Sequence, residues 1–155
     1  MTVIFPNIRL AHGGIVIFFS LICSFVLAED RPVEHPDLVW QKWSPSAFTR
    51  ARRENKLVLL DLTATWCQYC KKMDEVTYRD QRVTSMIKSH YIPVRADEAE
   101  YPSLARRYAK LGRPTTVIYS GDGTEIIQRR GYLKPQWMAW LLEAVADNPD
   151  PSAHR

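Results

Sequence analysis

Cysteine is scarce in this chain, its apolar runs are short, and neither sign of charge dominates. Three cysteines in 155 residues are too few for a small domain held together by many disulfides. The 21 basic and 17 acidic residues give a net charge of only +4, too small an excess to indicate nucleic-acid binding. Hydrophobic residues at 46% and charged residues at 25% match an ordinary globular protein, which excludes disordered and collagen-like structure. The length allows one domain.

The first 28 residues have the pattern of a secretory signal peptide. Arg9 is followed by an apolar run over residues 15–27, and small residues precede the expected cleavage point after Ala28. This order predicts that residues 1–28 are removed. The run is shorter than the ~20 apolar residues that span a bilayer comfortably. An uncleaved N-terminus that anchors the chain in the inner membrane is the alternative.

Cleavage after Ala28 would also change the cysteine content of the chain. It would remove Cys23 and leave only Cys67 and Cys70, three positions apart. Export places this pair in an oxidising compartment, where disulfides form and persist.

Three segments are expected after the signal peptide. Residues 29–39 contain prolines and charges without periodicity and read as an extended leader, residues 40–147 as a folded domain, and residues 148–155 as a flexible tail. Within the domain, helical and strand patterns alternate. This alternation predicts an α/β fold with a central mixed β-sheet flanked by helices on both faces. The first two long strands are joined by a crossover, which requires them to be parallel.

The elements of the domain are expected from apolar patterns and capping residues. Residues 57–60 form a continuous apolar run, typical of a strand buried on both faces. A helix over residues 67–78 follows it. The other expected elements are helices over 45–55, from Asp80 through Ile87, over 102–111 and from Pro135, a strand over 91–96, and a hairpin of strands 115–119 and 125–128.

Four of the tryptophans are expected to have packing roles. Trp40 and Trp43 precede the first helix and should hold the leader against the domain. Trp137 and Trp140 are three positions apart on the last helix, so we expect them in the core or at its edge.

Cys67 and Cys70 have the spacing of a redox pair at a helix N-terminus. Cys67 follows the turn from the buried strand, where unpaired N–H groups and the helix dipole stabilise a thiolate. Cys70 lies about one helical turn further on, so its sulfur is within bonding distance of that of Cys67. Because the thiolate is the nucleophile in thiol–disulfide exchange, we expect Cys67 to attack and Cys70 to resolve the mixed disulfide.

A pair of cysteines can also form a structural disulfide, bind a metal ion or attach a haem. Closing so short a loop constrains the unfolded chain little, which disfavours a purely structural disulfide. A metal site needs more ligands than the pair offers, and the histidines lie in unrelated segments. Haem attachment needs His after the second cysteine, where Lys71 stands. Redox chemistry is the favoured interpretation, and the structural disulfide and metal site stay open.

The chain resembles the thioredoxin family over about residues 40–146. The resemblance is carried by residues 57–61, by the Trp-Cys-x-x-Cys motif within residues 65–71, and by Gly-Arg-Pro-Thr at 112–115. Residues 43–55 and 72–78 are most similar to the exported bacterial branch, to which the C-terminal domain of DsbD-type thiol reductases belongs. The resemblance implies a thioredoxin fold and a redox-active Cys67–Cys70 disulfide.

The same resemblance implies roles for three further residues. Pro114 matches the family's cis-proline, which presents backbone to an extended substrate; a trans proline that only ends a helix is the alternative. Asp61 matches the buried carboxylate that relays a proton to the resolving cysteine; a solvated Asp at a strand end is the alternative. Trp66 matches the tryptophan beside the redox pair, and packing accounts for it as well as partner recognition does.

Three residues depart from the usual family pattern. Gln68 and Tyr69, between the cysteines, are neither the Gly-Pro of reducing thioredoxins nor the Pro-His of strong oxidants. A tyrosine before the second cysteine is similar to glutaredoxins and some disulfide isomerases. Arg113 stands where an aliphatic residue or threonine is commoner, and we expect it to favour acidic partners.

These observations predict an exported, periplasmic thiol:disulfide oxidoreductase that acts as a reductase. Its partners would be a membrane or periplasmic thiol donor and periplasmic protein disulfides, with no nucleic acid. We expect a monomer that uses the redox-active disulfide and no cofactor or metal. The alternatives are a disulfide oxidase or isomerase, and a non-catalytic thioredoxin-fold module that binds a partner or a copper ion.

Overall fold

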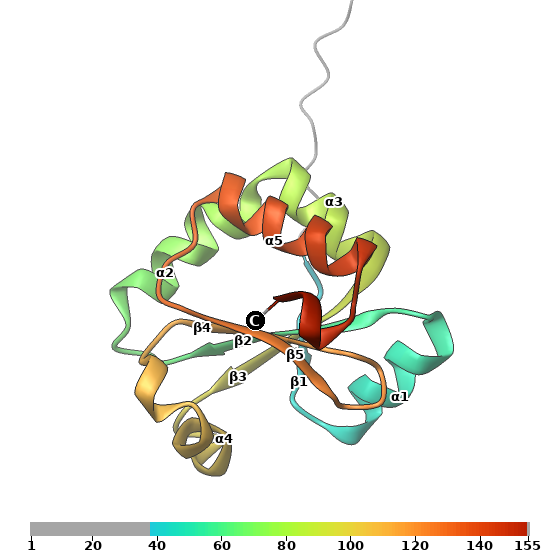
Figure 1. Ribbon diagram of the computed structural model, residues 1–155. Helices are drawn as coiled ribbons and strands as arrows, with labels where there is room; N and C mark the ends of the chain where they lie inside the picture. Colours follow the sequence, from blue (N-terminus) through green and yellow to red (C-terminus); the bar gives the residue numbers. More distant parts are fainter. Residues whose placement is uncertain (1–37, 155) are drawn as a thin grey trace, which may run out of the picture. The chain divides into compact units, whose positions relative to one another are not determined.

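A five-stranded sheet organises residues 38–154, the part of the chain that the computed structural model describes (Figure 1). The predicted signal peptide, Cys23 and most of the predicted leader lie outside these residues. The elements, with η for 3-10 helices, are β1 (Gln41–Lys42), α1 (Pro45–Glu54), β2 (Leu57–Thr63), α2 (Gln68–Glu75), η1 (Thr77–Arg79), α3 (Gln81–His90), β3 (Tyr91–Asp97), α4 (Pro102–Arg107), η2 (Ala109–Leu111), β4 (Thr115–Tyr119), β5 (Glu125–Arg130), α5 (Pro135–Asp147) and η3 (Pro151–His154).

The strands lie in the order β1-β3-β2-β4-β5, which places β2 at the centre of the sheet. β2 is parallel to β3 and antiparallel to β4, so the predicted crossover and the predicted mixed sheet are confirmed. β4 and β5 form the predicted antiparallel hairpin. β1 is a two-residue strand that pairs with β3 and that the sequence pattern does not predict.

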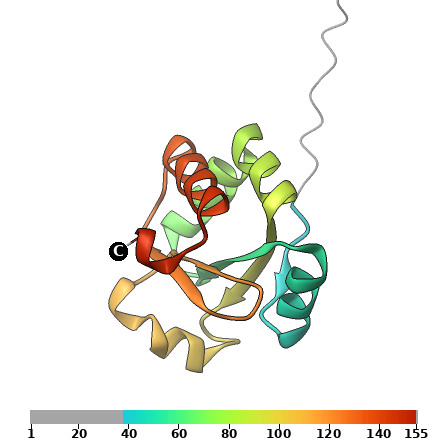
Figure 2. The same ribbon diagram turned by 45° about the vertical axis from the view of Figure 1, so that its right-hand side comes forward.

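Helices cover both faces of the sheet, as predicted. α2, α3 and α5 lie on one face and α1 and α4 on the other (Figures 1 and 2). Side chains of β2 alternate between the two resulting cores: Leu59 packs with Met138 under α5, and Leu60 packs with Ala51 of α1. The continuous apolar run is therefore a strand buried on both faces, because each side faces a helical layer.

Capping residues set the limits of several helices. The Asp80 side chain accepts hydrogen bonds from the backbone N–H groups of Arg82 and Val83 at the start of α3. Asn55 ends α1 in the left-handed conformation, with φ of 51°. Proline occupies the first turn of α1, α4 and α5, where its missing N–H has no intrahelical partner to lose.

The predicted helix over residues 67–78 is shorter than expected. α2 ends at Glu75, and the chain continues as the 3-10 helix η1. Thr77 and Tyr78 are buried there, and the Thr77 hydroxyl donates a 2.6 Å hydrogen bond to the carbonyl of Leu133. The hydrogen bond of Thr77 to the segment before α5 and the burial of Tyr78 in the core therefore compete with continuation of the helix. The helix expected over 102–111 is likewise divided into α4 and η2.

The C-terminal part differs from the expected one at two tryptophans and includes a further short helix. Trp137 and Trp140 are each 56% exposed, because the buried face of α5 consists of Met138, Ala139, Leu142 and Val145. Residues 148–155, which we expected as a flexible tail, include the helix η3, which contacts β5. By contrast, Trp40 packs edge-on against Tyr78 and contacts the core, as predicted.

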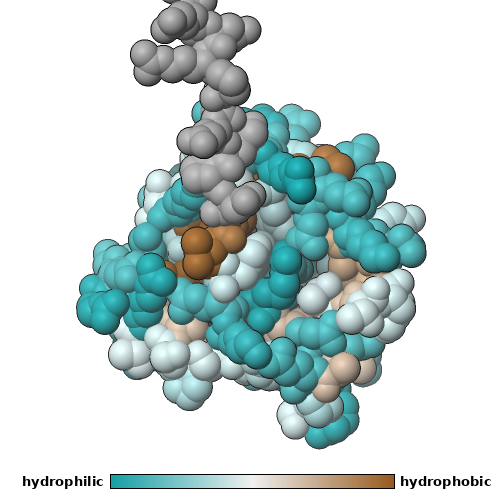
Figure 3. All heavy atoms as spheres, turned by 180° about the vertical axis from the view of Figure 1, so that it is seen from behind, coloured by the Kyte–Doolittle hydropathy of each residue, from teal (hydrophilic) through white to brown (hydrophobic). Residues whose placement is uncertain are grey.

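The large apolar side chains that are exposed among the described residues are Val39, Trp66, Tyr69, Val76, Trp137 and Trp140. Seen from behind, the molecule is mainly hydrophilic, with apolar residues in small separate areas (Figure 3). Among the described residues, no helix combines the length and apolar character that a membrane crossing requires.

Candidate redox site

Cys67 and Cys70 form a disulfide at the start of α2, with their Cα atoms 5.3 Å apart. Cys67 is the N-cap residue of the helix, and its sulfur accepts a 3.1 Å hydrogen bond from the backbone N–H of Cys70. The predicted pairing and the predicted helix N-terminus are both present. An N–H group directed at sulfur from a helix N-terminus stabilises negative charge there, which favours a thiolate once the disulfide is reduced.

The disulfide is nearly buried between exposed aromatic side chains. Cys67 is 3% and Cys70 5% exposed, and both pack with Ala64. Trp66 and Tyr69 are 66% and 60% exposed, so Trp66 is not a core-packing residue. A large partner can therefore contact apolar surface next to a disulfide that bulk solvent scarcely reaches.

Tyr69 belongs to a small cluster on one side of the disulfide. Its ring stacks on that of Tyr132, with the ring centroids 6.4 Å apart. The Lys72 ammonium lies 4.9 Å from the centroid of Tyr132, within the range of a cation–π interaction. Tyr132 comes from the segment between β5 and α5, a contact that the sequence pattern does not reveal.

Pro114 lies beside the end of β2 from which the chain continues to the disulfide. Thr115, its neighbour, pairs with Leu62 in the β2–β4 register. The Arg113–Pro114 peptide bond is cis, and the carbonyl of Pro114 accepts a 2.8 Å hydrogen bond from the N–H of Gly131. The fold thus places Pro114 at the end of β2 that leads to the redox pair, although Pro114 and Cys70 are more than forty residues apart in the sequence.

We expected from the sequence that Arg113 would favour acidic partners, and this expectation is wrong because its side chain does not point out of the protein. Its side chain is only 4% exposed, and it donates hydrogen bonds to the carbonyls of Gly112 and Ala105. Its Nε also lies 3.2 Å from a carboxylate oxygen of Glu98. The guanidinium is therefore used inside the protein, where it holds the loop before Pro114.

Asp61 is buried within β2 and forms an ion pair that the sequence analysis does not predict. Its Oδ2 accepts a 3.1 Å hydrogen bond from Nε of Arg95 in β3, and Nη2 of the same guanidinium lies 3.0 Å from that oxygen as an ion pair. The same guanidinium contacts Asp74 of α2 and stacks on Trp40, 4.1 Å from its ring centroid. The alternative of a solvated Asp at a strand end is wrong, since Asp61 is only 2% exposed.

Burial raises the pKa of Asp61 from 3.8 to about 6, even though the adjacent Arg95 lowers it. Its buried Oδ1 has no partner within ordinary hydrogen-bond geometry in the described residues, and although an interaction with the Tyr78 hydroxyl also lowers the pKa of Asp61, burial outweighs it. Asp74 adds negative charge and raises the pKa of Asp61 further. A carboxyl group with this pKa can exchange a proton near neutral pH.

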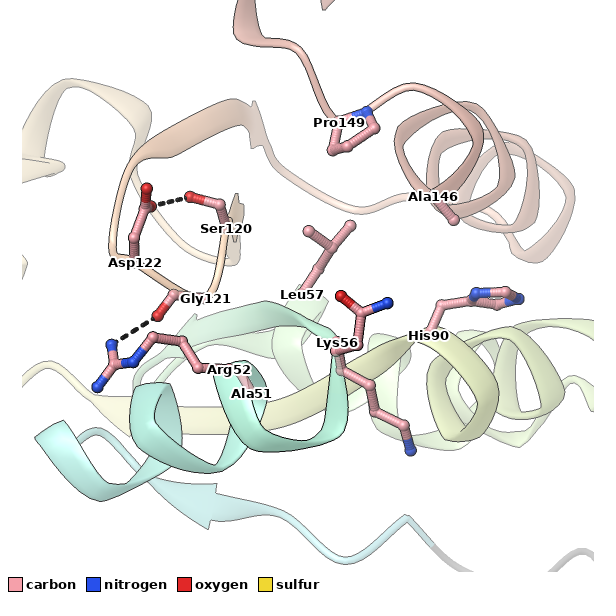
Figure 4. A pocket seen from close by; sticks show the side chains of 11 residues that line it. Ala51, Arg52, Lys56, Leu57, His90, Ser120, Gly121, Asp122, Ala146 and Pro149 are labelled. Atoms are coloured by element: carbon pink, nitrogen blue, oxygen red, sulfur yellow. Dashed lines mark hydrogen bonds between the residues drawn. The ribbon is translucent and has the colours of Figure 1, made fainter.

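A separate cavity of about 500 Å³ lies at the opposite end of β2, beside Leu57 (Figure 4). Arg52, one of its lining residues, donates a 2.8 Å hydrogen bond to the carbonyl of Gly121. Lys56 donates to the carbonyl of Lys88 at 2.7 Å. Because these cations already bind main-chain carbonyls, they are less available to a ligand, and the disulfide region is the better candidate for a functional site. In residues 38–154 no group of three or more potential ligands among His, Cys, Asp and Glu could hold a metal ion.

Comparison with known proteins identifies a family and relatives to which this chain is similar. Residues 27–124 match the model of the Thioredox_DsbH family, described as "Protein of unknown function, DUF255". The thiol:disulfide interchange protein DsbD of Yersinia pestis is 32% identical over 83 residues, which are 52% of this chain and 14% of that protein. This chain therefore spans only a small part of that relative's length.

Solved structures with the same fold include thioredoxins and related oxidoreductases. A thioredoxin from Thermus thermophilus has a TM-score of 0.62 and 23% identity, over 71% of this chain and 88% of that one. A DsbH oxidoreductase has a TM-score of 0.59 and 18% identity, over 77% and 90% of the two chains. At these identities the structural matches establish the thioredoxin fold.

Proposed function

Since this chain belongs to the Thioredox_DsbH family of thioredoxin-like proteins, we propose that it is a thiol:disulfide oxidoreductase that acts through Cys67 and Cys70. The observation that carries the proposal is the position of the disulfide. Cys67 caps α2 and its sulfur accepts an N–H group, while Cys70 is within disulfide-bonding distance in the first turn.

The proposed reaction is a two-electron exchange between the cysteine pair and a protein disulfide. The Cys67 thiolate attacks one sulfur of the substrate disulfide, which forms a mixed disulfide and releases the other substrate sulfur as a thiolate. Cys70 then loses its proton and attacks the sulfur of Cys67. The Cys67–Cys70 bond forms, the second substrate thiolate leaves, and the pair has been oxidised while the substrate has been reduced.

The surrounding residues support distinct parts of this reaction. Asp61, with a pKa of about 6, would accept the proton of Cys70 as it attacks. Pro114 would present backbone to the substrate next to the sulfur atoms, as in the family. Trp66, Gln68 and Tyr69 are exposed around the disulfide and would contact the partner.

Within this proposal the protein is an exported reductase of the periplasm. Support comes from the pattern of residues 1–28 and from the relative named thiol:disulfide interchange protein. A membrane or periplasmic thiol donor would reduce the Cys67–Cys70 disulfide, and the resulting dithiol would reduce periplasmic protein disulfides. An oxidase or isomerase is the alternative within the same chemistry.

The equilibrium redox potential of residues 29–155 tests the direction of exchange. The chain would be equilibrated in glutathione buffers, trapped with acid and alkylated, and its free thiols counted by mass spectrometry. A potential of about −270 mV, as in thioredoxin, supports a reductase, whereas a value of about −120 mV would mark an oxidant. A Cys67→Ser/Cys70→Ser variant is the blank. If the wild type neither reduces nor oxidises any protein substrate, the proposed enzyme activity is wrong.

A further inference from the structure

Trp66, which would contact the partner, belongs to a connected polar cluster with Glu98 and Arg113, two residues that have no part in the exchange steps. The indole N–H of Trp66 donates a 2.8 Å hydrogen bond to one carboxylate oxygen of Glu98. The other oxygen of Glu98 lies 3.2 Å from Nε of Arg113. A single carboxylate therefore joins the residue before Cys67 to the residue before Pro114.

Glu98 and Arg113 are themselves firmly held. The N–H of Glu98 donates a 3.0 Å hydrogen bond to the carbonyl of Thr63, the last residue of β2. Arg113 is nearly buried and donates to the carbonyls of Gly112 and Ala105. Trp66 differs from both, because at 66% exposure its orientation cannot be fixed by burial. Among the described residues, Glu98 is the hydrogen-bond partner of the indole N–H.

The indole forms part of the wall of a hollow that Glu98 and Arg113 also line. Trp66 and Glu98 border a cavity of about 350 Å³, and small residues beside the indole leave it open: Ala105, Ala109 and Gly112. The orientation of Trp66 therefore decides the shape of the surface that a large partner meets beside Cys67.

We propose that Glu98 is a positioning residue that holds the Trp66 indole for contact with protein substrates. The inference rests on the proposed exchange function and assigns a residue to its preference for protein disulfides over small ones. A protein disulfide brings flanking chain that covers Trp66, whereas a small disulfide such as oxidised glutathione needs little beyond the sulfur atoms. Glu98 consequently contributes to exchange with proteins and hardly to exchange with small disulfides.

The kinetic test compares Glu98→Ala with the wild type on insulin and on oxidised glutathione. We expect insulin reduction to slow about tenfold, the scale of losing a charge-assisted hydrogen bond, and glutathione reduction to change less than about twofold. Glu98→Gln keeps an acceptor for the indole, so its rate of insulin reduction should lie between those of the wild type and Glu98→Ala. The matched control is Glu100→Ala, since Glu100 lies on the same segment but pairs with Lys42.

A double-mutant cycle separates positioning from a general structural effect. In a Trp66→Phe background, Glu98→Ala should have no further effect on insulin reduction, because the indole that Glu98 would position is absent. An undiminished effect of Glu98→Ala in that background would overturn the proposal. So would an equal slowing of the insulin and glutathione reactions.

Fluorine NMR of the 5-fluorotryptophan protein gives a readout that does not depend on activity. The five tryptophans give five signals, and Trp66→Phe identifies the one from Trp66. Glu98→Ala should shift this signal while Glu100→Ala leaves it in place. If the wild type reduces neither substrate, the proposed function fails, and an unshifted Trp66 signal would separately refute the role of Glu98.

Discussion

Replacement of Asp61 by Asn should stabilise the oxidised protein at neutral pH and have almost no effect in acid. The folded protein raises the pKa of Asp61 from 3.8 to about 6, chiefly through burial. A carboxyl group with a raised pKa favours folding fully while it is protonated in both states, below about pH 4. That contribution is lost as the pH rises through 6, because the folded state then holds a buried carboxylate.

The size of the effect follows from the shift in pKa. Each pKa unit corresponds to about 1.4 kcal/mol, so a change from 3.8 to about 6 corresponds to about 3 kcal/mol. Asn is neutral at every pH and resembles the protonated carboxyl group in size. The free energy of unfolding of Asp61→Asn should therefore exceed that of the wild type by about 3 kcal/mol above pH 7. The excess should shrink through pH 6 to 4.

Urea unfolding of the oxidised wild type and the Asp61→Asn variant between pH 3.5 and 8 measures this difference directly. Asp80→Asn provides a control of opposite sign. Burial would raise the pKa of Asp80, but hydrogen bonds from Arg82 and Val83 lower it, so its carboxylate stabilises the fold above the ordinary pKa and less in acid. A difference between wild type and Asp61→Asn that did not vary with pH, or that favoured the wild type at pH 7, would refute the reasoning.

Two other variants test the site and its loop. Cys70→Ser should accumulate mixed disulfides with protein substrates on non-reducing gels, because the resolving thiol is missing; trapping by Cys67→Ser instead would reverse the order of the two cysteines. Gly112→Ala should lower the free energy of unfolding by about 1–3 kcal/mol, since φ of 70° with ψ of −154° strains any residue with a Cβ atom. Urea unfolding beside the exposed-site control Lys110→Ala measures this loss, and equal stabilities would contradict it.

Local sequence signals predict the main elements of this fold well. The apolar run at the start of β2, Asp80 as a helix cap and the glycines between β4 and β5 each fix a boundary through interactions within a few residues. The position of the redox pair at a helix N-terminus is predicted from the same kind of short-range sequence signal. The end of α2 does not, because the burial of Thr77 depends on Leu133, a residue distant in the sequence.

Side-chain partners across strands are the part of the site that could not be predicted from the sequence. The register of β2 and β3 places Arg95 opposite Asp61, and a shift of that register would give Asp61 another partner. Similarly, the role of Arg113 depends on Glu98, which follows a different strand. An arginine in a half-buried strand is a signal that a carboxylate lies nearby, although it does not say which one.

The central position of β2 links reduction of the site to the exchange of amide protons with solvent. Backbone groups of Leu59 and Leu60 lie between two paired strands, so their protons are released mainly when the whole domain unfolds. Their exchange rates in the oxidised and reduced protein therefore measure the folding free energy of each form. By a thermodynamic cycle, the difference between these energies is the amount by which the fold alters the reducibility of the Cys67–Cys70 bond relative to the unfolded chain.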